Sequence, residues 1–285
     1  MSTKTFIVSG DSHTVPRKYP ETPYSWPTYL AQERGWDLIN VAKGGGSNTH
    51  IFNSLIDTIE QNREKDIVVF AFWSEAFRVN FFDLACRVLE SEERLLRQLE
   101  LEEYGDAHKK YATEAVIFSD AAVDLMERNM SQSISCRIQH AYECAVNFTL
   151  RQLWMMDQWC KFHDIEFYHG SALSPFGDNS MIHTLRTRFD MDGLSADEHI
   201  RNGVASIKER NPYYKYLNES QNYMGFGFDG WQYINANNLN ISKRDRHPND
   251  EGHRRLSGII SKFIDDNVRI NINNEQYSRP VFIYD

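Results

Sequence analysis

The sequence has no excess of basic residues and no long apolar run, and each absence removes a class of protein. Its 285 residues carry a formal net charge of −9, which argues against nucleic-acid binding because that needs a clustered basic surface. No stretch approaches the roughly 20 apolar residues that span a bilayer, and the first residues contain no signal-peptide core. We therefore expect a cytoplasmic protein without a nucleic-acid or membrane partner.

The sequence also lacks paired cysteine motifs, nucleotide-binding glycine motifs and internal repeats. None of its four cysteines forms a CxxC pair (Cys86, Cys136, Cys144 and Cys160), which favours free buried thiols in a reducing compartment over a disulfide or metal site. Neither G-x-G-x-x-G nor a Gly-Lys-Ser/Thr ending occurs, so a nucleotide loop is not expected.

Short apolar runs bounded by turn residues recur in the manner of a parallel sheet. Between them lie two helical patterns. The first, at 26–35, begins after Pro27 and stops at Gly35. The second lies near 49–59, with Asn48 or Thr49 as the expected N-cap. The alternation indicates a doubly wound α/β sheet. The four expected strands are residues 4–9, 37–42, 66–73 and 164–168.

A longer segment, residues 82–163, reads as mostly helical and predicts an insertion within a single domain of residues 1–285. Its last part carries an apolar stripe at helical spacing that we expect to face the core rather than a partner. That stripe comprises Tyr142, Val146, Leu150, Leu153, Met156 and Cys160. Residues 170–240, rich in Asn, Gly and aromatics, are expected to be long loops, forming either a substrate lid or a satellite hydrophobic cluster. A last helix is expected to start at 248–250.

Two distant segments carry the residue types of a nucleophilic site. Ser12 follows the first strand in Gly10-Asp11-Ser12-His13, where a strand-to-helix turn bares a side chain. A hydroxyl needs a base, and the base needs an orienting carboxylate. Asp245 and His247, in Asp-Arg-His-Pro-Asn, supply both. The plainer alternative makes His247 a surface histidine and Asp245 an N-cap.

A glycine-rich loop, Gly44-Gly45-Gly46-Ser47-Asn48, follows the second strand. Glycines let backbone N–H groups approach a ligand closely, which suits an oxyanion hole. A phosphate-cradling loop is the competing interpretation.

Together these motifs resemble the SGNH hydrolase superfamily, the GDSL-like esterases. The resemblance matches Gly10-Asp11-Ser12 to the family's first block, Gly45 to its oxyanion-hole glycine, and Asp245 and His247 to the rest of the triad. It implies a three-layer α/β/α, flavodoxin-like sheet. The family's third block departs: Phe72-Trp73-Ser74-Glu75 stands where an oxyanion-hole asparagine is usual. Asn48 or Ser74 is then expected to substitute, or the hole is weaker.

The predicted function is that of a serine esterase acting on small-molecule or carbohydrate O-acyl esters, with no metal or organic cofactor. Catalysis is assigned to Ser12, Asp245 and His247, and the oxyanion hole to Ser12, Gly45 and Asn48. Two alternatives stay open: a binding protein that kept the fold without efficient chemistry, and a metallophosphoesterase using Asp11 and His13. An arginine cluster near the site is a possible anion holder: Arg244, Arg246, Arg254 and Arg255.

Overall fold

The computed structural model describes residues 3–15, 24–76, 134–176, 193–242 and 245–266, with the side chains of 134–142 and 193–201 left aside. Four parallel strands form its sheet in the order β2-β1-β3-β4. Their bounds are Thr5–Gly10 for β1, Asp37–Asn40 for β2, Ile67–Trp73 for β3 and Glu166–Ser171 for β4. This is the strand order of a flavodoxin-like doubly wound sheet, as predicted.

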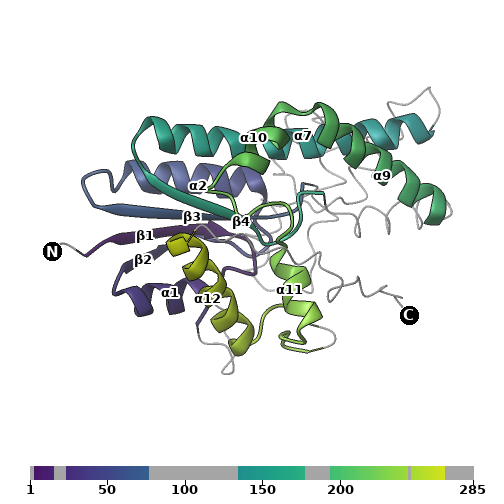
Figure 1. Ribbon diagram of the computed structural model, residues 1–285. Coiled ribbons are helices and arrows are strands. Elements are labelled where there is room, and N and C mark those ends of the chain that lie inside the picture. Colours follow the sequence, from purple (N-terminus) through teal and green to yellow (C-terminus); the bar gives the residue numbers. More distant parts are fainter. Residues whose placement is uncertain (1–2, 16–23, 77–133, 177–192, 243–244, 267–285) are drawn as a thin grey trace, which may run out of the picture.

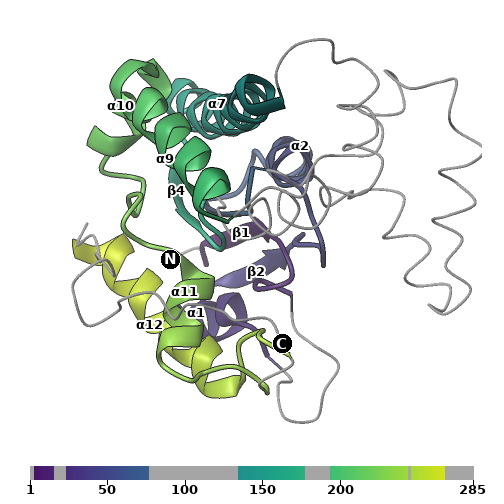
Figure 2. The ribbon, with the colours of Figure 1, turned by 90° about the vertical axis from the view of Figure 1, so that its right-hand side faces the viewer.

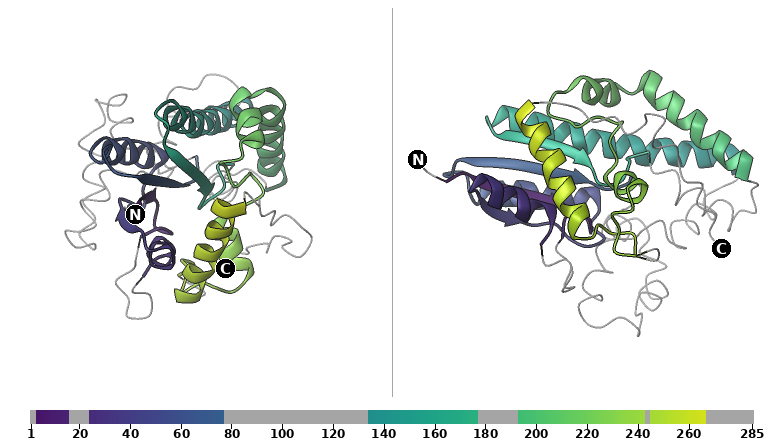
Figure 3. Two further views of the ribbon diagram at one scale, coloured as in Figure 1. Left: turned by 60° about the vertical axis from the view of Figure 1, so that its left-hand side comes forward. Right: turned by 60° about the horizontal axis from the view of Figure 1, so that its bottom comes forward.

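Both faces of the sheet are buried because apolar side chains alternate along β1 and β3 without a polar face. Phe6 and Val8 of β1 pack on one face with Trp26 and Leu30. That face is covered by α1 (Trp26–Arg34) and α12 (Asp250–Asp266), which pack against each other. Figure 1 shows these two helices side by side below the sheet, and Figure 3 shows the same helices from two further sides.

The opposite face carries Ile7 of β1 and Val69 and Ala71 of β3. It is covered by α2 (Asn48–Glu60) and the long α7 (Ile134–Phe162). Figure 2 shows the three layers nearly end on, with α2 and α7 on one side of the strands and α1 and α12 on the other. The three-layer α/β/α prediction is therefore confirmed.

The predicted core stripe of α7 is confirmed where its side chains are described. Val146, Leu150, Leu153, Met156 and Cys160 are all fully buried against α2 and the sheet. Tyr142 and residues 82–133 of the predicted insertion lie outside the described residues. Cys144 lies at the surface of α7, so the expectation that the thiols are buried is confirmed for Cys160 and wrong for Cys144.

Residues 193–236 are wrongly predicted as loops, because three helices occur there: α9 (Gly193–Arg210), α10 (Pro212–Glu219) and α11 (Gly230–Ala236). α9 and α10 pack on α7. The aromatic side chains of this region join the core cluster around α7: Tyr214 stacks on Phe226 with ring centroids 4.6 Å apart, and Tyr223 is fully buried. Of the two alternatives, these side chains fit a hydrophobic cluster, but one that is continuous with the core rather than a separate satellite.

The start of α12 is fixed to α1. Tyr29 of α1 donates a short hydrogen bond to the Asp250 carboxylate in the first turn of α12, and the Arg254 guanidinium lies 4.3 Å from the centre of the Tyr29 ring. Burial, followed by the bond to Asp250, raises the pKa of Tyr29 to about 12. Because α12 begins three residues after His247, this contact also anchors the segment that carries the predicted base.

Among the described residues, none of the helices combines the length and apolarity required to cross a bilayer.

Candidate active site

The predicted nucleophile, Ser12, follows the carboxyl end of β1, a strand that lies between β2 and β3. The chain passes from β1 to β2 on one side and returns to β3 on the other, so the β1 end is the switch point where doubly wound sheets bind ligands. Gly10 ends β1, and a Cβ there would lie 2.2 Å from Thr14 Oγ1. Only glycine fits this turn, which is closed by a hydrogen bond from Thr14 N to Asp11 O at 3.0 Å.

The segment before α12 brings His247 to Ser12 across 235 residues of sequence. His247 Nε2 lies 2.8 Å from Ser12 Oγ, and His247 Nδ1 lies 2.7 Å from Asp245 Oδ1. The same carboxylate oxygen accepts from the His247 backbone N–H at 3.1 Å. Because a carboxylate only accepts, the ring hydrogen belongs on Nδ1, and Nε2 is free to accept the Ser12 proton.

The loop that holds His247 is itself tied to the chain on both sides. Ile241 N donates to His247 O at 2.9 Å, and Asn249 N donates to Leu239 O at 2.7 Å. The Asn249 side chain accepts from Gly252 N at 2.8 Å and so caps the first turn of α12. Asp245 serves as the imidazole partner rather than as that cap.

The glycine loop packs directly on the Ser12 turn. Lys43 N donates to Gly10 O at 3.0 Å, and a Cβ on Gly46 would lie 3.3 Å from that same oxygen. Gly45 has φ +72°, a conformation that favours glycine. In the part of the chain that the structure describes, no protein acceptor is bound to the N–H of Ser12 or of Gly45, which leaves both donors for a ligand.

Asn48 has a different place from either role predicted for it. Its Nδ2 donates to Ser74 O at 2.9 Å and to Glu75 O at 3.4 Å, and its Oδ1 accepts from Ser74 N at 2.8 Å. The amide hydrogens are thus shared between the loop after β3 and Thr149 Oγ1 of α7, which lies 3.4 Å from Nδ2, and this corrects the assignment of Asn48 to the oxyanion hole. The helix cap is also corrected: Ser47, not Asn48 or Thr49, caps α2 by accepting from His50 N.

Ser74, the other expected substitute for the family's asparagine, is likewise occupied. Its hydroxyl donates to Asp11 Oδ2 at 3.2 Å, and both residues are fully buried. The loops after β1, β2 and β3 are therefore joined in one buried network through Asp11, Ser74 and Asn48. This network was missed from the sequence, because its members are ordinary turn residues until their loops are brought together.

The arginines near the site are turned to other partners. Arg254 pairs with Asp250 and Arg255 with Glu251, each one turn away on α12. The Arg246 guanidinium lies 5.9 Å from the centre of the Trp231 ring. The anion-holding cluster is therefore not assembled by the described residues, and Arg244 lies outside them.

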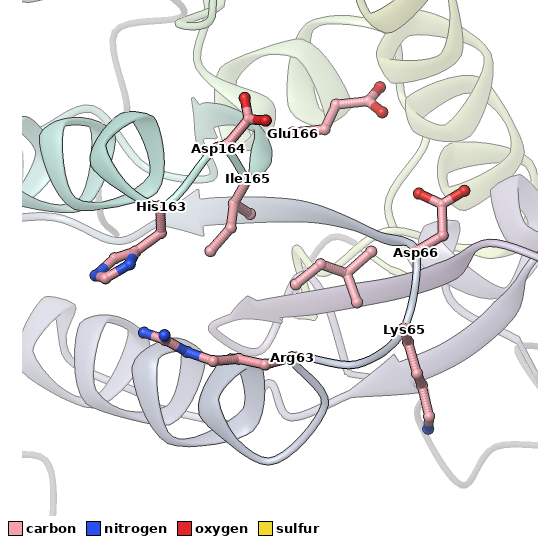
Figure 4. A pocket seen from close by; sticks show the side chains of 8 residues that line it. Arg63, Lys65, Asp66, His163, Asp164, Ile165 and Glu166 are labelled. Carbon is pink, nitrogen blue, oxygen red and sulfur yellow. The ribbon is translucent and has the colours of Figure 1, made fainter.

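A separate pocket opens at the other end of the sheet. Figure 4 shows it between the starts of β3 and β4, with acidic and basic side chains on its walls. Its position at the amino ends of the strands separates it from Ser12, which follows a carboxyl end. The lining residues are Arg63, Lys65, Asp66, Ile67, His163, Asp164, Ile165 and Glu166.

No protein-family model matches the chain, and no curated protein sequence does so either. It is similar to a lipase from a goat rumen metagenome, with 13% identity and a TM-score of 0.43 over 91% of this chain and 96% of that chain. A putative lipolytic protein of the G-D-S-L family from Desulfitobacterium hafniense has 15% identity and a TM-score of 0.37 over 92% and 99%. An acetyl xylan esterase has 13% identity and a TM-score of 0.37 over 90% and 97%.

Proposed function

We propose that this protein is a serine esterase of the SGNH type, with Ser12 as nucleophile, His247 as general base and Asp245 as its orienting carboxylate. One observation carries the proposal. A single imidazole makes a 2.8 Å contact with a hydroxyl through Nε2 and a 2.7 Å contact with a carboxylate through Nδ1. Both lie at the switch point of a parallel sheet, beside two backbone N–H groups that have no acceptor among the described residues.

The chemistry follows from these positions. Ser12 Oγ forms a bond to the acyl carbon while its proton passes to His247 Nε2. The tetrahedral oxyanion is stabilised by the N–H groups of Ser12 and Gly45. When the acyl–oxygen bond breaks, His247 returns the proton to the leaving alcohol. Water then attacks the acyl-enzyme with His247 again as base, which releases the acid and restores the Ser12 hydroxyl.

Loss of the Asn48 side-chain donor makes this oxyanion hole a two-donor site. One such donor typically contributes about 10²–10³ in rate. We therefore propose that turnover is modest and fastest on activated esters such as p-nitrophenyl esters, with O-acyl esters of small molecules or carbohydrates as the substrate class. The retained triad favours catalysis over a binding protein that only kept the fold.

The test is hydrolysis of p-nitrophenyl acetate, butyrate and octanoate and of bis-p-nitrophenyl phosphate, each with and without EDTA. We expect turnover of the acyl esters that survives chelation and is lost in Ser12→Ala. Chelator-sensitive turnover of the phosphate ester would instead support the metallophosphoesterase alternative, and the absence of any turnover would support a binding protein.

A further inference from the structure

A second Asp–His pair lies beside the predicted triad and is not used by it. Asp11 Oδ1 accepts from the His13 backbone N–H at 2.9 Å and lies 3.2 Å from His13 Nδ1. Asp245 binds His247 in the same way, through its backbone N–H and Nδ1. Each carboxylate thus holds the imidazole two residues further on by the same two atoms.

The two imidazoles are neighbours. The ring centres of His13 and His247 are 5.1 Å apart, and their planes are inclined by 31°. The two pairs differ in exposure, since the His13 side chain is 4% exposed and that of His247 is 29% exposed. The buried His13 ring therefore packs against the more exposed ring of His247.

The fully buried carboxylate of Asp11 fixes the orientation of His13. Asp11 accepts from the His13 backbone N–H and the Ser74 hydroxyl and contacts His13 Nδ1. These are the bonds that an ionised carboxylate accepts when the ring hydrogen is on Nδ1. His13 Nε2 is buried without a protein partner among the described residues.

We infer that Asp11 and His13 form a positioning pair for His247, an inference that rests on the proposed esterase function. The proton that leaves Ser12 makes His247 an imidazolium. The Asp11 carboxylate, bound to a His13 ring whose centre lies 5.1 Å from that of His247, offers negative potential to that cation, and on this buried side of His247 the interaction is screened less than in water. The pair thereby stabilises the charged state of His247 and keeps its ring facing Ser12.

Other ionisable groups stand on the loops that meet at this site. They are Asp245 and Arg246 before α12, Lys43 with His50 around the glycine loop, and Glu75 after β3. Asp245 bonds to His247 directly, and Arg246 lies over Trp231. All of them are unchanged in a His13 variant, so such a variant isolates the second pair.

The test compares two variants with the wild type. His13→Phe keeps an aromatic ring but has no ring nitrogens, and His13→Gln keeps polar atoms. We expect His13→Phe to lower kcat about tenfold with KM unchanged, and to lower the acid-limb pKa of kcat/KM by about one unit, the shift equivalent to a tenfold change. His13→Gln should recover part of both. His169→Asn is the matched control, because it removes a buried imidazole of β4 that touches no triad residue, and it should leave the acid-limb pKa unchanged.

Two results would overturn the inference separately from the proposed function. If Ser12→Ala abolishes turnover but both His13 variants keep the wild-type acid-limb pKa and kcat, the triad stands and the positioning role is wrong. If the His13 variants lower kcat only in proportion to the folded fraction measured by circular dichroism, His13 is merely structural. If Ser12→Ala retains turnover, the proposed function fails and the positioning role fails with it.

Discussion

At the scale of the residue, the proposed function depends on the two nitrogens of His247. Nδ1 is committed to Asp245 and Nε2 to Ser12, so the tautomer is set by one carboxylate. Both Asp245 and His247 keep about a quarter of their side chains exposed, which leaves the imidazole open to an incoming ester. Orientation by Asp245, rather than deep burial, therefore holds the base in place.

Replacing Asp245 by Asn is expected to cost catalysis without loss of substrate binding. An amide can donate to Nδ1, which moves the ring hydrogen to Nε2 and removes the base that Ser12 needs. We expect kcat for p-nitrophenyl acetate to fall by about 10²–10⁴-fold with KM nearly constant. Asp265→Asn, which removes an α12 carboxylate paired with Arg34, is the control. A threefold or smaller loss in Asp245→Asn would contradict the assignment.

At the scale of the element, the loops after three strands are held together by side-chain bonds to backbone. Asn48, in the first turn of α2, satisfies both Ser74 N and Ser74 O. The neighbouring Ser47 instead caps its own helix. Of these two adjacent polar residues, Asn48 therefore joins two elements, whereas Ser47 stabilises only its own helix.

The variants Asn48→Ala and Ser47→Ala separate these roles. Asn48→Ala leaves a buried donor and a buried acceptor without partners, and we expect it to lower the free energy of unfolding by about 2–4 kcal/mol. Ser47→Ala removes one cap and should cost about 1 kcal/mol. Urea unfolding measures both. At urea concentrations where Asn48→Ala is still folded, its kcat should stay within a few-fold of wild type. A hundredfold fall in kcat would instead support Asn48 as an oxyanion-hole donor.

The element scale also shows what the sequence can and cannot predict. The strands and α1, with its stop at Gly35, were predicted because apolar runs and turn residues are local signals. α10 and α11 were missed although Asn211-Pro212 and Asp229-Gly230 offered N-cap signals. These helices have eight and seven residues, too few to be stable alone, so packing on the rest of the molecule decides them.

The site divides in the same way. The contacts of His247 with Ser12 and Asp245 could be predicted from the sequence because each residue belongs to a short motif of chemically distinctive residues. The partners of Asn48 and the nearness of His13 to His247 depend on how separate loops meet, which no local pattern records.

At the scale of the whole molecule, the core contains a histidine, His169, whose imidazole stays neutral in the folded protein until about pH 3. His169 is fully buried and accepts a hydrogen bond at Nδ1 from Trp73 Nε1–H at 3.0 Å. Burial lowers the pKa of His169 to about 3, and burial together with Lys43 lowers that of His50. Since an unfolded histidine has a pKa near 6.5, acid favours the unfolded chain.

The sign follows from proton uptake. Below about pH 6.5 the unfolded state binds a proton at His169 that the folded state refuses until about pH 3. The contribution of His169 to the free energy of unfolding is thus fully present above about pH 6.5, and it falls by about 1.4 kcal/mol per pH unit below that pH. His169→Asn keeps an acceptor for Trp73 but does not titrate. Its loss of unfolding free energy between pH 7 and pH 5, measured in urea, should be smaller than that of wild type by about 2 kcal/mol. Equal losses would contradict this pKa.

The central claim is that Ser12 carries the acyl group, and covalent capture of the nucleophile tests it most directly. The protein is incubated with a fluorophosphonate probe, and its intact mass and labelled peptide are measured by mass spectrometry. The triad predicts one adduct per chain, on the peptide that contains Ser12, lost in Ser12→Ala while the circular dichroism spectrum is unchanged. Labelling that persists in Ser12→Ala, or that maps to another residue, would contradict the claim.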